Sequence, residues 1–117
     1  MQTEKVYYGV ILEFRPSDPL GVSNTVVELL PRRRREAFAA ALQDVPPPAE
    51  RASNRLLYER HEDAVTAAQR LRAVADRVSL QQLQRRNDME TESVYGLGGW
   101  LMPSGHQYVP ISGREEV

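Results

Sequence analysis

The sequence contains no cysteine, and this absence excludes several kinds of chemistry at once. Disulfides, zinc–thiolate centres, iron–sulfur clusters and cysteine nucleophiles all require it. No apolar run approaches the roughly 20 residues of a membrane-spanning helix. The first residues of the chain also lack the apolar core and cleavage site of a secretory signal. We therefore expect a protein of the cytoplasm or of a complex assembled inside the cell, without a membrane partner.

Residues that would carry catalysis or bind metal are also scarce. The only two histidines, His61 and His106, lie far apart in the chain and do not form a helical metal-binding pair. Ser104-Gly105-His106 lacks the Gly-x-Ser-x-Gly pattern of a nucleophile elbow. The alternating Asp88, Glu90 and Glu92 indicate an exposed acidic segment rather than a calcium site, because no glycine turn accompanies them. We expect no enzyme activity, no cofactor and no metal.

The composition is that of an ordinary globular domain. The chain has 117 residues, of which 41% are hydrophobic and 26% charged, values close to the average for folded domains. Glycine and proline become frequent from residue 96 onward. We predict one α+β domain over residues 1–95 and an extended C-terminal arm or loop over residues 96–117.

The clearest predicted element is a strand over residues 6–14, which is rich in β-branched and aromatic residues and ends before Pro16. Its almost continuous apolar character is typical of a central strand covered on both faces. Gly9, in its middle, indicates a bulge or a close approach of another group to the backbone. A helix is expected after Pro31, and the three prolines at 46–48 end it.

Residues 49–86 fit two alternatives. The spacing of Leu57, Ala64, Leu71 and Val78 suits one long helix. Residues 55–60 also have the pattern of a strand, with a new helix over about residues 62–78 that starts with acidic residues in its first turn. We prefer the second alternative because the strand at 6–14 needs partners. Residues 80–86 are then a third strand or a helical continuation, and a short strand is expected near residues 107–111.

These elements predict an α+β fold, a small sheet of three or four strands with two helices on one face, in the order β-α-β-α-β. A ferredoxin-like arrangement is the nearest known architecture, and a helical hairpin with a β-strand edge is the alternative. The expected core residues are all apolar: Val10, Leu12, Phe14, Phe38, Leu42, Leu57, Val65, Leu71 and Val78.

Charge is distributed unevenly along the chain. Residues 31–86 carry a net +5, whereas residues 1–30 carry −2 and residues 87–117 carry −4. Such segregation suits head-to-tail self-association or an acidic tail that folds over a basic face. Arg32–Arg35 form the most basic stretch. Four guanidinium groups suit an acidic partner or phosphates, and the alternative is a solvated first helical turn beside Glu28 and Glu36.

A glycine-rich segment precedes the only tryptophan, Trp100. Gly96-Leu97-Gly98-Gly99 lacks the spacing of a nucleotide-binding loop. Trp100 with Leu101 and Met102 suits either insertion into a neighbouring subunit or packing on the chain's own sheet. The expected partner-binding residues combine the arginine run with this segment: Arg32, Arg33, Arg34, Arg35, Trp100, Leu101, Met102 and Tyr108.

The function that these observations predict is a non-catalytic protein–protein interaction or assembly subunit, within a homo-oligomer or a larger structural complex. The first alternative is a small nucleic-acid-binding regulator that uses Arg32–Arg35 together with Arg51, Arg55 and Arg60. The second is a small enzyme or ligand-binding domain, which would require a deep pocket lined by His61 and several carboxylates.

Overall fold

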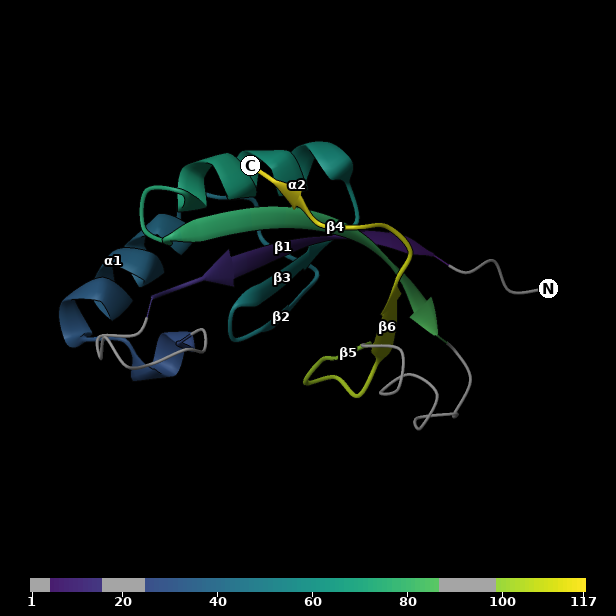
Figure 1. Ribbon diagram of the computed structural model, residues 1–117, viewed down its shortest axis with the longest axis horizontal. Helices are drawn as coiled ribbons and strands as arrows, with labels where there is room; N and C mark the ends of the chain where they lie inside the picture. Colours follow the sequence, from purple (N-terminus) through teal and green to yellow (C-terminus); the bar gives the residue numbers. More distant parts are fainter. Residues whose placement is uncertain (1–4, 16–24, 87–98) are drawn as a thin grey trace.

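The computed structural model describes residues 5–15, 25–86 and 99–117, which form one curled antiparallel sheet of seven strands with two α-helices (Figure 1). Along the sheet the order is β2-β3-β1-β4-β6-β5, and β7 also pairs with β4. The elements follow one another along the chain as β1 (Val6–Glu13), η1 (Val27–Leu29), α1 (Arg32–Leu42), β2 (Glu50–Ala52), β3 (Arg55–Tyr58), α2 (His61–Leu71), β4 (Arg77–Arg86), β5 (Trp100–Leu101), β6 (Gln107–Pro110) and β7 (Glu115–Glu116).

β1 is the central strand, as its apolar character predicts. It pairs with β3 on one side, where Tyr8 lies opposite Tyr58, and with β4 along its whole length on the other, from Val6 opposite Gln84 to Glu13 opposite Arg77. Because side chains alternate between the two faces of a strand, β1 supplies apolar residues to both sides of the sheet.

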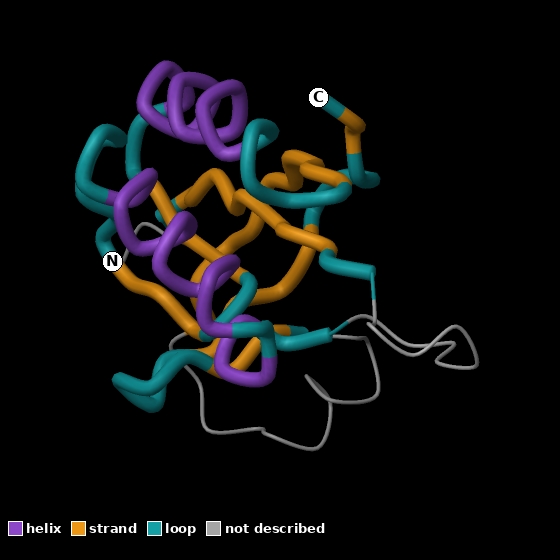
Figure 2. Tube along the Cα trace, turned by 90° about the vertical axis from the view of Figure 1, so that its left-hand side faces the viewer, coloured by secondary structure: helices purple, strands orange, loops and turns teal. Residues whose placement is uncertain are grey.

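Both helices cover the same face of the sheet, and in the end-on view they lie side by side over the strands (Figure 2). Phe38 of α1 meets Phe14 edge-to-face, with ring centroids 5.9 Å apart. Small residues of α2, Ala64, Ala67 and Ala68, are fully buried and bring this helix close to the strands. This helix-covered face holds the larger core, whose strand residues include Val10, Leu12, Leu56, Tyr58 and Val78.

The opposite face, here called the open face, holds a second and smaller core. It gathers the apolar side chains Tyr7, Ile11, Leu57, Leu83, Trp100, Met102 and Tyr108. Gly9 makes this packing possible. A Cβ atom at Gly9 would lie 2.5 Å from Cη2 of Trp100 and 2.6 Å from Cδ1 of Leu83. The close approach predicted at this glycine is confirmed, and the group that approaches is the indole ring.

The predicted three- to four-stranded ferredoxin-like sheet is wrong. The structure has seven strands, and the additional ones are β2, β5 and β7, each of two or three residues. Residues 99–117 also do not form an extended arm, because β5, β6 and β7 join the sheet. The physical reason is that β4 is ten residues long and offers its outer edge to both β6 and β7. The combination of helices and sheet is the part of the prediction that fits.

Other predictions can be compared element by element. A strand followed by a helix is confirmed by β3 and α2, but the helix ends at Leu71 rather than near residue 78, and residues 77–86 form β4. Of the expected core, Leu42 and Val65 are only half-buried, and Leu57 belongs to the core of the open face. The predicted domain boundary at residue 95 and the acidic residues Asp88, Glu90 and Glu92 lie outside the described residues.

Candidate binding surfaces

The four arginines at the start of α1 do not act as one surface. Arg34 donates to the Val74 carbonyl and pairs with Asp76, both at 3.2 Å, and its guanidinium lies 5.3 Å from the Phe14 ring centroid. Arg35 donates to the Leu30 carbonyl at 3.0 Å. Arg32 pairs with Glu36 one turn along the helix. Arg33 is exposed. Two of the four side chains therefore hold α1 in place, and Arg32 and Arg33 face solvent.

The predicted contact residues of the C-terminal segment divide in the same way. Trp100, Met102 and Tyr108 are 1–2% exposed and pack on the chain's own sheet. Leu101, which points to the other side of β5, is 48% exposed. Of the two alternatives for Trp100, packing on its own sheet is the one found here, and Leu101 is the residue of this segment that is free to meet a partner.

Exposed large apolar side chains occur in two separate places. Leu29 of η1 is 75% exposed and its neighbour Val26 is 40% exposed, whereas Leu101 and Ile111 are each 48% exposed. η1 lies beside α1 at the left of Figure 1, and β6, which leads into Ile111, lies on the right. The molecule is elongated, with extents of 47 × 31 × 24 Å. Leu29 and Ile111, here named the Leu29 site and the Ile111 site, therefore lie on segments at different places along it.

The Leu29 site is held firmly. Asn54, buried in the turn between β2 and β3, accepts from the Val27 backbone N–H and donates to the Thr25 carbonyl, both at 2.9 Å. Ser53 donates to Glu28 at 2.9 Å. This contact lowers the pKa of the Glu28 carboxyl, after the larger effect of its own backbone N–H. The short helix is thus fixed to the sheet, and Leu29 projects from a rigid base.

Away from Trp100, the open face carries charged and polar side chains in place of the apolar cluster. Arg55, Ile11, Ser79 and Glu116 lie opposite one another across β3, β1, β4 and β7. The Arg55 guanidinium lies 4.6 Å from the centroid of the Trp100 ring. Burial lowers the pKa of Arg55, and the charge of Arg114 lowers it further. An open cavity of about 550 Å³ lies on the same face. It is lined by Glu13, Arg77, Ser79, Arg114 and Glu116.

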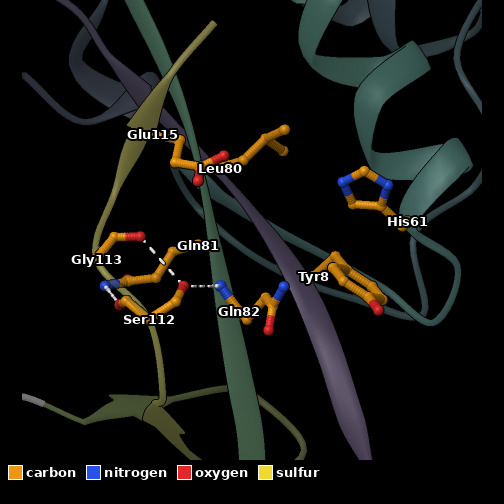
Figure 3. Close-up of a pocket in the computed structure, with 8 residues that line it drawn as sticks. All are labelled: Tyr8, His61, Leu80, Gln81, Gln82, Ser112, Gly113 and Glu115. Carbon is orange, nitrogen blue, oxygen red and sulfur yellow. Dashed lines mark hydrogen bonds between the residues drawn. The ribbon is translucent and has the colours of Figure 1, made fainter.

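A smaller pocket of about 370 Å³ lies beside His61 (Figure 3). The His61 and Tyr8 rings meet edge-to-face on one side, with centroids 5.1 Å apart, and residues 112–115 form the other side. Ser112 Oγ accepts a hydrogen bond from the Gln82 backbone N–H at 2.9 Å, and the Ser112 backbone carbonyl accepts one from Gln81 Nε2 at 3.1 Å. Glu115 is the one carboxylate among the lining residues. The pocket thus contains His61 but one carboxylate, where the enzyme or ligand-binding alternative expects several.

Glu50 joins β2 to the turn between β5 and β6. One carboxylate oxygen accepts from Ser104 Oγ at 2.7 Å and lies 3.1 Å from His106 Nδ1. Burial alone would raise the pKa of Glu50, but the hydrogen bonds from Ser104, Tyr108 and His106 outweigh it and hold that pKa below the ordinary value. Ser104 and His106 both bind the same carboxylate, so the trio lacks the serine–histidine hydrogen bond of a catalytic triad. Its position indicates a structural clasp.

Within residues 5–15, 25–86 and 99–117 no group of three acidic or histidine side chains is placed to hold a metal ion. No helix among these residues is both long and apolar enough to cross a membrane. Comparison with known proteins finds no matching family model, no matching curated protein and no matching solved structure. The function must therefore be argued from the chain's own residues.

Sequence reasoning did not single out Leu29, Ile111, Ser79 or Arg114 as site residues. The signal for Leu29 was present, since it is apolar and directly precedes Leu30-Pro31 and the arginine run. No such signal marks Arg114 or Ser79. Ser79 acquires its position from the register of β4 with β1 and β7, which no local pattern contains.

Proposed function

We propose that this protein is a non-catalytic assembly subunit that binds other protein chains, and that its partner is a second copy of itself. The observation that carries the proposal is the pair of exposed apolar sites: the rigidly held Leu29 at one place and Ile111 at another. The proposed setting is the cytoplasm or a complex assembled inside the cell.

Two dissimilar sites favour a head-to-tail contact over a symmetric one. In a two-fold dimer the same patch meets itself, whereas a contact between different patches continues from copy to copy and closes into a ring or extends as a filament. We infer that the Leu29 site of one copy docks at the Ile111 site of the next. Because η1 is already fixed by Asn54, little conformational entropy is lost when Leu29 is buried.

Charge supports the same surface. Arg32 and Arg33 are exposed three and four residues after Leu29, and polar residues beside an apolar centre are typical of interfaces. The nucleic-acid alternative has less support, because the arginines that it requires are dispersed. Arg51 and Arg55 occupy neighbouring strands but meet different aromatic rings, Phe38 under the helices and Trp100 on the open face.

The test uses light scattering after size-exclusion chromatography over a range of protein concentrations. We expect the native chain to form a discrete oligomer with protein-like absorbance at 260 and 280 nm. Leu29→Glu and Ile111→Glu, which place a charge in each site, should each be monomeric. Ala40→Glu, a change at an exposed position of α1 two turns beyond Arg33, is the matched control and should leave the oligomer intact.

Mixing the two monomeric variants gives the sharper result. Leu29→Glu keeps its Ile111 site and Ile111→Glu keeps its Leu29 site, so an equimolar mixture should form a 1:1 dimer and nothing larger. A native chain that is monomeric at every concentration, or a mixture that stays monomeric, contradicts the proposal. Co-purifying nucleic acid that is released by salt would favour the alternative function instead.

A further inference from the structure

The open face carries two guanidinium groups whose charge nothing in the described chain neutralises. Arg55 and Arg114 lie near enough for the charge of one to affect the other, yet among the described residues no carboxylate is within ion-pair distance of either. Arg55 is also partly buried, with its guanidinium over the Trp100 ring. Burial and the nearby charge of the exposed Arg114 both disfavour the charged form of Arg55, and a bound anion would offset both effects.

Ser79 provides a second and independent observation. Ser79 is only 4% exposed, and its hydroxyl is buried without a hydrogen-bond partner among the described residues. Ser79 lies in the same cross-strand row as Arg55 and lines the same cavity as Arg114. A buried hydroxyl normally finds a partner. A hydroxyl without one, at the wall of a cavity next to two cations, is a donor available to an acceptor oxygen.

The charged residues around the cavity determine how much positive charge remains on this part of the open face. Arg77 donates to both carboxylate oxygens of Glu116, at 3.0 and 3.3 Å, and lies 3.6 Å from Glu13. Arg77 is therefore already neutralised by these two carboxylates. Together the five groups, Arg55, Arg77, Arg114, Glu13 and Glu116, have a net charge of +1, so positive charge remains after these ion pairs are counted.

We propose that Arg55, Arg114 and Ser79 form a binding site for a single oxyanion, a phosphate or a carboxylate group, on the open face of the sheet. Guanidinium groups bind both kinds of oxyanion through paired N–H donors, and the Ser79 hydroxyl adds a neutral donor. The anion is either free in solution or carried by a larger molecule. This site is separate from the Leu29 and Ile111 sites and does not depend on self-association.

The only tryptophan of the chain reports on the site directly, because Arg55 lies over its ring. Sodium phosphate and, separately, sodium acetate are titrated into the protein at constant ionic strength while Trp100 fluorescence is recorded. We expect a saturable change with at least one of them. Saturation by phosphate alone assigns a phosphoryl ligand, and saturation by acetate alone assigns a carboxylate. The absence of a saturable change with either salt overturns the proposal.

Variants then locate the binding. Arg114→Gln, at an exposed position, should weaken it at least tenfold, and Ser79→Ala should weaken it several-fold without loss of the folded state. Arg60→Gln, which removes an exposed arginine just before α2, is the matched control and should bind as the native chain does. Unchanged binding in Arg114→Gln contradicts the proposal. The monomeric variant Leu29→Glu should still bind the anion, so failure of the assembly proposal and failure of this one can be told apart.

Discussion

The two faces of the sheet differ in how completely their side chains are packed and hydrogen-bonded within this chain. Under the helices, the core residues are apolar and each is packed by neighbours from the strands, α1 or α2. On the open face, an aromatic cluster around Trp100 occupies one part, and charged residues with an unpaired serine hydroxyl occupy the rest. Buried apolar cores on both faces stabilise the fold, and the open face alone also carries a buried serine hydroxyl without a partner among the described residues.

The largest expected effects test whether both faces belong to one cooperative unit. Trp100→Ala on the open face and Phe38→Ala under the helices should each lower the free energy of unfolding by about 3–5 kcal/mol, since each removes a buried aromatic ring. Urea denaturation followed by circular dichroism measures both. A cost below about 1 kcal/mol for Trp100→Ala would show that the aromatic cluster is not part of the stable core.

Gly9→Ala should cause the next largest loss of stability. The added methyl group would overlap the Trp100 ring and Leu83, and overpacking of this kind costs about 1–3 kcal/mol. Gly113→Ala is the matched control, because a Cβ atom there meets nothing within 4 Å. Thermal unfolding of the two variants side by side gives the comparison. Equal stability of the two would mean that the indole does not lie against β1.

Glu50→Gln probes the clasp between β2 and the β5–β6 turn. Losing its charge-assisted hydrogen bonds should cost about 1–2 kcal/mol near neutral pH. The pKa of Glu50 is lowered by folding from its ordinary value of 4.5, so its contribution is present above that value and disappears as the pH falls through the folded pKa. Urea denaturation at about pH 6 and about pH 3 should therefore show that the free energy of unfolding falls less between these pH values in the variant than in the native chain. An identical loss in both proteins would argue against the clasp.

The smallest effect is expected at Ser79, and its sign is opposite. Replacing this buried, unpaired hydroxyl with alanine should raise the free energy of unfolding by up to about 1 kcal/mol, because no hydrogen bond is lost and a desolvated polar group is removed. The measurement is urea denaturation without phosphate. Destabilisation would mean that the hydroxyl has a partner within the chain. A gain in stability together with weaker anion binding would indicate that Ser79 serves binding rather than folding.

Much of the fold was predictable from local pattern. The apolar β1, the proline-terminated α1 and the acidic first turn of α2 each indicated the correct element. The short strands were not predictable in this way, because Glu50–Ala52 and Glu115–Glu116 are polar and pair only because β3 and β4 present free edges to them. A signal for β2 was available in Ser53-Asn54, a two-residue turn in which Ser53 has a positive φ of 50°.

The candidate sites were predictable only in part. The arginine run was correctly placed at a helix N-terminus, but its division into structural and exposed members depends on Asp76 and on the Leu30 carbonyl. Likewise, nothing in the sequence relates Arg55 to Arg114, residues from strand β3 and from the segment before β7. The cross-strand register places them on the same face of the sheet, with β1 and β4 between their strands.

The central position of β1 also sets the kinetics of folding. Its partners are residues 55–58 and 77–84, so every ladder that it makes closes a long loop of chain. Such nonlocal pairing slows folding toward the millisecond-to-second range typical of sheet-rich domains. Until both partners arrive, the apolar segment Val6–Glu13 is exposed on both faces and both edges. A chain stalled at that stage is prone to aggregate, and this segment is where a chaperone would be expected to bind.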